Sequence, residues 1–240
     1  MMENVIISAS FIGGATLLGS LAGVVLGKRC ERYLGVILSF SAGVMLLAAI
    51  SGLIMPSVEG ADAFGIIMSV LGILAGALVL YLTDKISPLI SGESSARAAL
   101  LFALAVAIHN LPEGIAAGIG YGAGDVGAAA RVSLGIALHN IPEGMIVTVP
   151  LTSSGVKPYK AFLLGASGGV AEVLGSLIGY FAARVAAAFL PFALAFAGGT
   201  MLYAIFAELI PESLMYGKRR ATFALLIGLS VMLFLSVTMS

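Results

Sequence analysis

Residues 97–150 read RAALLFALAVAIHNLPEGIAAGIGYGAGDVGAAARVSLGIALHNIPEGMIVTVP. Two apolar stretches here, 97–120 and 129–150, are each long enough to cross a bilayer as a helix of about 20 residues. Each contains one copy of a six-letter motif, HNLPEG from His109 and HNIPEG from His139, and five of the six letters are shared. Because the link between the stretches is short, the two predicted helices run antiparallel, and the motifs form an inverted pair.

Similar apolar runs recur along the whole chain of 240 residues, which is 60% apolar and only 10% charged. Soluble domains are about 45–50% apolar and about 25% charged, so a soluble globule is excluded. Cutting the chain at charged and Gly/Pro/Ser-rich breaks predicts eight spans, at about 5–27, 34–55, 65–84, 97–120, 129–150, 160–183, 189–213 and 221–239. The links are short, which predicts one transmembrane domain over residues 1–240 and an all-α polytopic membrane protein.

The charges exclude some partners and predict an orientation. Twelve Lys+Arg balance twelve Asp+Glu, so there is no basic excess to hold a nucleic-acid backbone. The single cysteine excludes an internal disulfide and a Cys-rich zinc cage. Apart from Arg131 and Arg184, the Lys and Arg residues lie in or beside the first, third, fifth and seventh loops. Cytoplasmic loops are enriched in these residues, so both termini are predicted to lie outside the cytoplasm in a cell (inner or plasma) membrane.

The two motifs place the same chemistry twice near mid-bilayer. His109 and Glu113, like His139 and Glu143, are four residues apart and therefore share a helix face. A carboxylate at the bilayer centre costs several kcal/mol unless it is paired or binds a cation. Neither span has a Lys or Arg in its interior, so the natural counter-charge is a divalent ion held by two carboxylates and two neutral imidazoles. This donor set suits Zn²⁺, with Fe²⁺, Mn²⁺, Co²⁺ and Cd²⁺ as competitors.

The proline of each motif is expected to disturb its helix. Pro112 and Pro142 have no N–H for the carbonyl four residues earlier, that of Ile108 or Leu138. We expect each turn to kink open at this point. The freed carbonyl would then face a cavity rather than lipid, as irregular backbone inside a membrane must.

A third intramembrane carboxylate, Glu172, lies midway along the sixth span. With Asn110 and Asn140, and with the two motif glutamates bridging, it would form a second, oxygen-rich site and a binuclear arrangement. The alternative is that Glu172 only hydrogen-bonds a neighbouring helix, as polar residues in membrane bundles do.

Two more carboxylates, Glu208 and Glu212, lie four residues apart near the cytoplasmic end of the seventh span. Their spacing predicts an exit relay for the ion. The alternative for Glu212 is a position at the membrane interface.

A fainter echo suggests how the other spans are arranged. Residues 40–46 (FSAGVML) resemble residues 196–202 (FAGGTML), and the two segments lie in the second and seventh spans. Those spans are antiparallel in the predicted topology. The echo therefore favours two flanking three-helix units related by inversion around the central pair, a 3+2+3 inverted-repeat bundle.

The chain resembles the ZIP family of divalent-metal transporters, especially its bacterial members, along its whole length. The resemblance rests on eight spans, the doubled His-Asn-x-Pro-Glu-Gly motif, Glu172, and the Glu-x-x-Pro-Glu ending of span seven. It implies metal entry into the cytoplasm, with the metal as cargo and not as a cofactor. It implies one site of His109, Glu113, His139 and Glu143, and a neighbouring site of Asn110, Glu113, Asn140, Glu143 and Glu172.

The chain departs from the family pattern at two places. Many members have a His-rich loop between spans three and four, but residues 85–96 contain no His. Some members place a His before the span-seven glutamate, where this chain has Ala207. Metal sensing by the loop is therefore not expected, and the exit path depends on Glu208. The Gly-rich helix faces permit a homodimer without requiring one.

Two other functions are compatible with a metal site at mid-membrane. A metal exporter would use the same ligands, because the residues define a binding site and not a direction. An intramembrane metallohydrolase would need an open metal position and a general base, typically in His-Glu-x-x-His. That motif is absent, since Asn follows each His, so we expect a transporter and not an enzyme.

Overall fold

Helices make up nearly all of the chain that the structure describes. The computed structural model describes residues 2–27, 29, 32–86, 110–185 and 189–238, and these contain no β-strand. The helices are α1 (Met2–Leu26), α3 (Leu34–Ala49), η1 (Ile50–Ile54), α4 (Met55–Val58), α5 (Ala63–Ile86), α7 (Val126–Ser153), α8 (Pro158–Val185), α9 (Leu190–Ala204), η4 (Ile205–Leu209), α10 (Ile210–Met215) and α11 (Lys218–Thr238). A further helix covers 110–123. His109 and the first part of the predicted fourth span lie outside the described residues.

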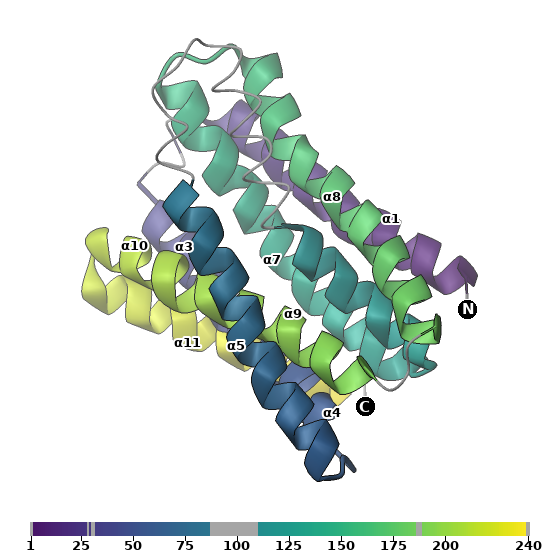
Figure 1. Ribbon diagram of the computed structural model, residues 1–240. Coiled ribbons are helices and arrows are strands. Elements are labelled where there is room, and N and C mark those ends of the chain that lie inside the picture. Colours follow the sequence, from purple (N-terminus) through teal and green to yellow (C-terminus); the bar gives the residue numbers. More distant parts are fainter. Residues whose placement is uncertain (1, 28, 30–31, 87–109, 186–188, 239–240) are drawn as a thin grey trace.

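Seven helical runs of the described chain are long and apolar enough to cross a membrane. They are α1, α3 to α4, α5, α7, α8, α9 to α10, and α11. The helix at 110–123 is the described part of the eighth predicted span. Figure 1 shows that α1 begins and α11 ends on the same side of the bundle. The protein is an all-α polytopic membrane protein.

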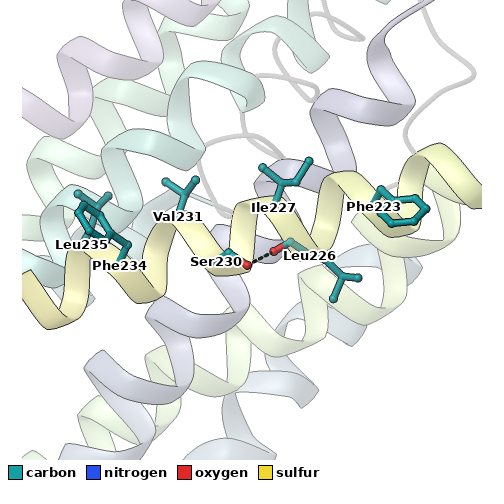
Figure 2. Close-up of a pocket in the computed structure, with 7 residues that line it drawn as sticks. All are labelled: Phe223, Leu226, Ile227, Ser230, Val231, Phe234 and Leu235. Atoms are coloured by element: carbon teal, nitrogen blue, oxygen red, sulfur yellow. Dashed lines mark hydrogen bonds between the residues drawn. The ribbon is translucent and has the colours of Figure 1, made fainter.

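The outer surface of the bundle is apolar. On α11, side chains such as Phe223, Ile227 and Phe234 are more than half exposed, and they line a shallow hollow along the helix (Figure 2). The polar residue among them, Ser230, donates its hydroxyl to the Leu226 carbonyl at 2.7 Å. This face therefore offers lipid only apolar groups and a satisfied hydroxyl, as a membrane requires.

A register of 156 residues relates the first three spans to the last three. Gly13 of α1 and Gly169 of α8 are 156 residues apart, and each lies against the carbonyl oxygen of the other. Thr16 and Glu172 have the same separation, and their side chains are hydrogen-bonded. Helices α1 and α8 therefore contact each other through equivalent residues, as two helices do when they lie on the symmetry axis that relates the two repeats.

The outer helix crossings repeat the same register. Helices α3 and α11 cross at Gly43 and Gly228. A Cβ on Gly43 would lie 2.0 Å from a carbonyl oxygen of α11, and a Cβ on Gly228 would lie 2.1 Å from a carbonyl oxygen of α3. Gly199 of α9 and Gly72 of α5 mark a second crossing in the same way. Gly199 lies 156 residues after Gly43, and Gly228 lies 156 residues after Gly72, so the two crossings are equivalent in the repeat. The sequence similarity between 40–46 and 196–202 is thus part of a longer repeat, an inverted pair of three-helix units.

The kink expected at the motif prolines stays a prediction, although the helical assignment is unbroken at Pro142. Helix α7 continues through Pro142 as one α-helix, whereas the turn before Pro112 begins outside the described residues. Irregular turns are assigned in the second and seventh spans, where the π-helices η1 and η4 come just before Pro56 and Pro211. The carbonyl four residues before each of those prolines lies inside the wider turn, which accommodates the missing N–H.

The helix at 110–123 packs very closely on α8. Gly114, Gly118 and Gly122 follow one another at the spacing of one helical turn, and a Cβ on any of them would lie within 2.5 Å of a carbonyl oxygen of α8. Those oxygens belong to Glu172, Ser176 and Tyr180. The glycines therefore bring the first motif next to Glu172.

Candidate metal-binding site

Three side chains of the two motifs form a cluster inside the bundle. Nε2 of His139 lies 3.6 Å from Oε1 of Glu113 and 3.6 Å from Oε2 of Glu143, and the three ligand atoms all lie within 4.8 Å of one another. His139 and Glu113 are 1% and 2% exposed, and Glu143 is 13% exposed. Ligand atoms about 2.1 Å from a tetrahedral ion are about 3.4 Å apart. The cluster is close to a size that fits Zn²⁺.

A second group of side chains joins this cluster to Glu172. Nδ2 of Asn110 donates to both carboxylate oxygens of Glu143, at 3.0 Å each, and to Oε1 of Glu172 at 2.9 Å. On the other side, the Thr16 hydroxyl contacts the two Glu172 oxygens at 2.9 and 2.8 Å. The amide nitrogen of Asn110 therefore lies between the two carboxylates, where the predicted second ion would lie.

The two motif asparagines also have free amide oxygens. Nδ2 of Asn140 donates to the Ile12 carbonyl at 3.1 Å, whereas Oδ1 of Asn110 and Oδ1 of Asn140 are buried with no hydrogen-bond partner among the described residues. A buried acceptor without a donor is costly, and a cation would satisfy it. For Asn110 to act as an oxygen ligand, its amide must rotate by about half a turn, because its nitrogen faces the carboxylates here.

The buried carboxylates lack the usual counter-charges. Neither Glu113 nor Glu172 forms an ion pair with a Lys or Arg of the described chain, and both are at most 2% exposed. Among the residues that the structure describes, no donor hydrogen-bonds either carboxylate oxygen of Glu113. Buried charges in proteins are paired or bound to metals, so the chemistry of this group fits a divalent cation.

The remaining predicted site residues lie elsewhere. His109 is outside the described residues. Glu208 lies in η4 and is half-buried, and Glu212 on α10 is exposed. Neither belongs to the described cluster of Glu113, His139 and Glu143. Metal binding by the motif residues and an exit role for Glu208 stay predictions.

A residue that the sequence did not single out, Ser41 of α3, contacts the cluster from the side. Its hydroxyl is hydrogen-bonded to Nδ1 of His139 and lies 3.4 Å from the backbone carbonyl of His139. If Nδ1–H donates to Ser41 and the hydroxyl donates onward to that carbonyl, the lone pair on Nε2 points toward Glu113 and Glu143. Such outer partners fix the tautomer and ring orientation of a metal-binding histidine.

We expect Ser41→Ala to weaken zinc binding by about 10- to 100-fold, as the loss of an outer hydrogen bond to a ligand does. Ser51→Ala is the matched control, because the Ser51 hydroxyl bonds only its own helix, at the Leu47 carbonyl. Zinc titration of both purified variants by calorimetry tests this. Equal affinities in the two variants would contradict a role for Ser41 in orienting His139.

Side chains of α3, α5 and α9 pack beside Glu113. A small space beside Glu113 is lined by Met45, Leu80, Thr200, Met201 and Ala204, and it is too small to hold a water molecule. Met45 and Met201 occupy equivalent positions in the 156-residue repeat.

Comparison with known proteins identifies the family of the chain. The family described as ZIP zinc transporter matches residues 91–236. Zinc transporter GufA of Myxococcus xanthus is 33% identical over 98% of both chains, and zinc transporter ZupT of Chlorobaculum parvum is 36% identical over 90% of both. Human zinc transporter ZIP11 is 42% identical over 153 residues, which are 61% of this chain. The chain matches about 45% of the length of ZIP11. This multi-pass protein of the cell membrane belongs to the ZIP zinc transporter family.

Proposed function

We propose that this protein carries divalent transition-metal ions, zinc first, across the cell membrane and into the cytoplasm. The observation that carries the proposal is the cluster of Glu113, His139 and Glu143, which is buried in the bundle and has the donor set and spacing of a zinc site. These relatives are all zinc transporters, which favours zinc as the cargo. Cd²⁺, Fe²⁺, Mn²⁺ and Co²⁺ are proposed as competitors, because mixed nitrogen and oxygen ligands select weakly among them.

The proposed binuclear arrangement adds a second ion next to the first. Asn110, Asn140 and Glu172 would supply oxygen ligands, and Glu113 and Glu143 would bridge the two ions. Two facts support this: the amide oxygens of both asparagines lack donors in the described chain, and Asn110 already connects Glu143 to Glu172. A cation between those carboxylates would take the place of the amide nitrogen that donates hydrogen bonds to both of them.

The proposed transport step needs a change of shape, because the space beside Glu113 admits no water. The π-helices η1 and η4 lie in the two spans that bear Met45 and Met201, and π-helical turns are common at moving or functional points. We propose that these spans shift relative to α7 and the helix at 110–123. The ion then leaves past Glu208, which lies in η4. Protons compete for the same ligand atoms, so uptake falls at acid pH.

The test is inward flux of radiolabelled Zn²⁺ into proteoliposomes of known orientation. We expect saturable flux toward the cytoplasmic face, with competition by the other divalent ions. Flux only in the opposite direction would favour an exporter. Cleavage of a membrane substrate without any flux would favour an intramembrane hydrolase, and either result would overturn the proposal.

A further inference from the structure

A cavity of about 500 Å³ opens at the basic end of the bundle, away from the metal cluster. It lies where α3 begins, α10 ends and α11 begins. The polar side chains of its wall are Arg32, Tyr33, Tyr216, Arg220 and Ser213, and the Ser213 hydroxyl already donates to the Ile210 carbonyl. Nothing in the proposed transport mechanism uses this cavity, so its chemistry needs its own explanation.

Two arginines, Arg32 and Arg220, line the cavity. Arg220 belongs to a run of three exposed cations, with Lys218 and Arg219, in the first turn of α11. That turn has no acidic residue, and no described carboxylate forms an ion pair with either lining arginine. The exposed Glu212 on α10 is not part of the wall. Cations in the first turn oppose the helix dipole, so an anion bound here would relieve an unfavourable arrangement.

Close packing builds the wall of the cavity. A Cβ on Gly35 would lie 2.3 Å from the Cβ of Tyr216, so only glycine allows α3 to lie against the end of α10. Gly217 has φ +132°, which lets the chain turn directly from α10 into α11. The guanidinium of Arg32 lies 4.7 Å from the centre of the Tyr33 ring. The aromatic and cationic groups are therefore positioned before any ligand arrives.

The location indicates the kind of anion. Tyr33 and Tyr216 stand at the ends of membrane-spanning helices, where aromatic residues mark the interface between lipid and water. The distribution of Lys and Arg predicts that this end is cytoplasmic, and the inner leaflet is the one that carries anionic lipids. Arginine guanidinium groups bind phosphate through two parallel hydrogen bonds.

We propose that this cavity binds the phosphate of an anionic glycerophospholipid. The lipid connects α3, which bears Ser41, to α10 and α11. It thereby stabilises the relative position of the second, seventh and eighth spans. The proposal does not depend on transport, because it concerns binding and stability of the purified chain.

The test is thermal unfolding of the full chain in neutral detergent, with added phosphatidylglycerol, phosphatidylcholine or inorganic phosphate. At about 100 times its Kd, phosphatidylglycerol is expected to raise the unfolding temperature by about 5–10 °C. Phosphatidylcholine is expected to have little effect, since the arginines repel its choline cation. The Arg32→Gln/Arg220→Gln variant is expected to lose the shift.

The matched control is Lys157→Gln/Lys160→Gln, which removes two exposed positive charges at the same end of the bundle but outside the cavity. It is expected to keep the shift. Circular dichroism without lipid shows whether both variants fold. An equal shift in the arginine variant, or none in the native chain, would overturn the proposal. If inorganic phosphate raised the unfolding temperature as much as phosphatidylglycerol does, the cavity would be a site for a soluble anion, and the lipid proposal would be overturned.

Discussion

Saturable zinc uptake is expected to fall by more than about 100-fold in the double variant Glu113→Gln/Glu143→Gln. Loss of an outer partner of a metal ligand already costs about 10- to 100-fold in affinity, and this variant loses two ligands and both charges. Glutamine keeps the side-chain volume, so the packing around the cluster is preserved. The measurement is initial uptake of radiolabelled Zn²⁺ into proteoliposomes across a range of zinc concentrations, compared with the native chain.

The control for lost negative charge is Glu3→Gln/Glu59→Gln. Both residues are exposed and stand apart from the cluster, so uptake is expected to match that of the native chain. Glu113→Asp adds a second comparison, because it keeps the charge but shortens the side chain. It is expected to retain zinc binding at lower affinity. Native uptake in the Gln/Gln variant would remove the motif carboxylates from the transport mechanism.

The doubled motif made much of the molecule predictable, because two carboxylates within apolar runs have few physical explanations. The residues around the cluster were harder to foresee. Ser41 and Thr16 contact His139 and Glu172 from other helices. Most hydroxyls in these spans bond their own helix instead, as Thr148 does to the Gly144 carbonyl. Residue type alone therefore does not distinguish a hydroxyl at the site, and only the register between helices does.

The prolines show a similar limit. Proline chemistry predicts a lost hydrogen bond but not where the helix absorbs it. Helix α7 stays α-helical through Pro142, whereas the turns before Pro56 and Pro211 widen into π-helices. The surrounding packing decides between these outcomes, since α7 is held between α1, α3 and α8.

The second large effect is expected at a glycine that bears no chemistry. In Gly114→Ala the new Cβ would lie 2.2 Å from the carbonyl oxygen and 2.7 Å from the Cα of Glu172. Both are backbone atoms, so the helix at 110–123 and α8 must move apart. Overpacking of this kind costs about 1–3 kcal/mol or more, which exceeds the gain of at most about 1 kcal/mol from replacing a helical glycine with alanine. We expect the unfolding temperature to fall by about 5 °C.

Moving the 110–123 helix away from α8 should also lower zinc affinity, because Asn110 hydrogen-bonds both Glu143 and Glu172, at 3.0 and 2.9 Å. Gly118→Ala, one turn further on, imposes a slightly closer clash, 2.0 Å from the Ser176 carbonyl oxygen, but lies farther from the ligands. Gly14→Ala is the control for alanine itself, since nothing lies within 4 Å of its Cβ position. We expect both packing variants to lose stability, Gly114→Ala to lose more zinc affinity than Gly118→Ala, and Gly14→Ala to lose neither. Equal zinc affinity in all three would mean that the spacing of the 110–123 helix from α8 does not set the geometry of the site.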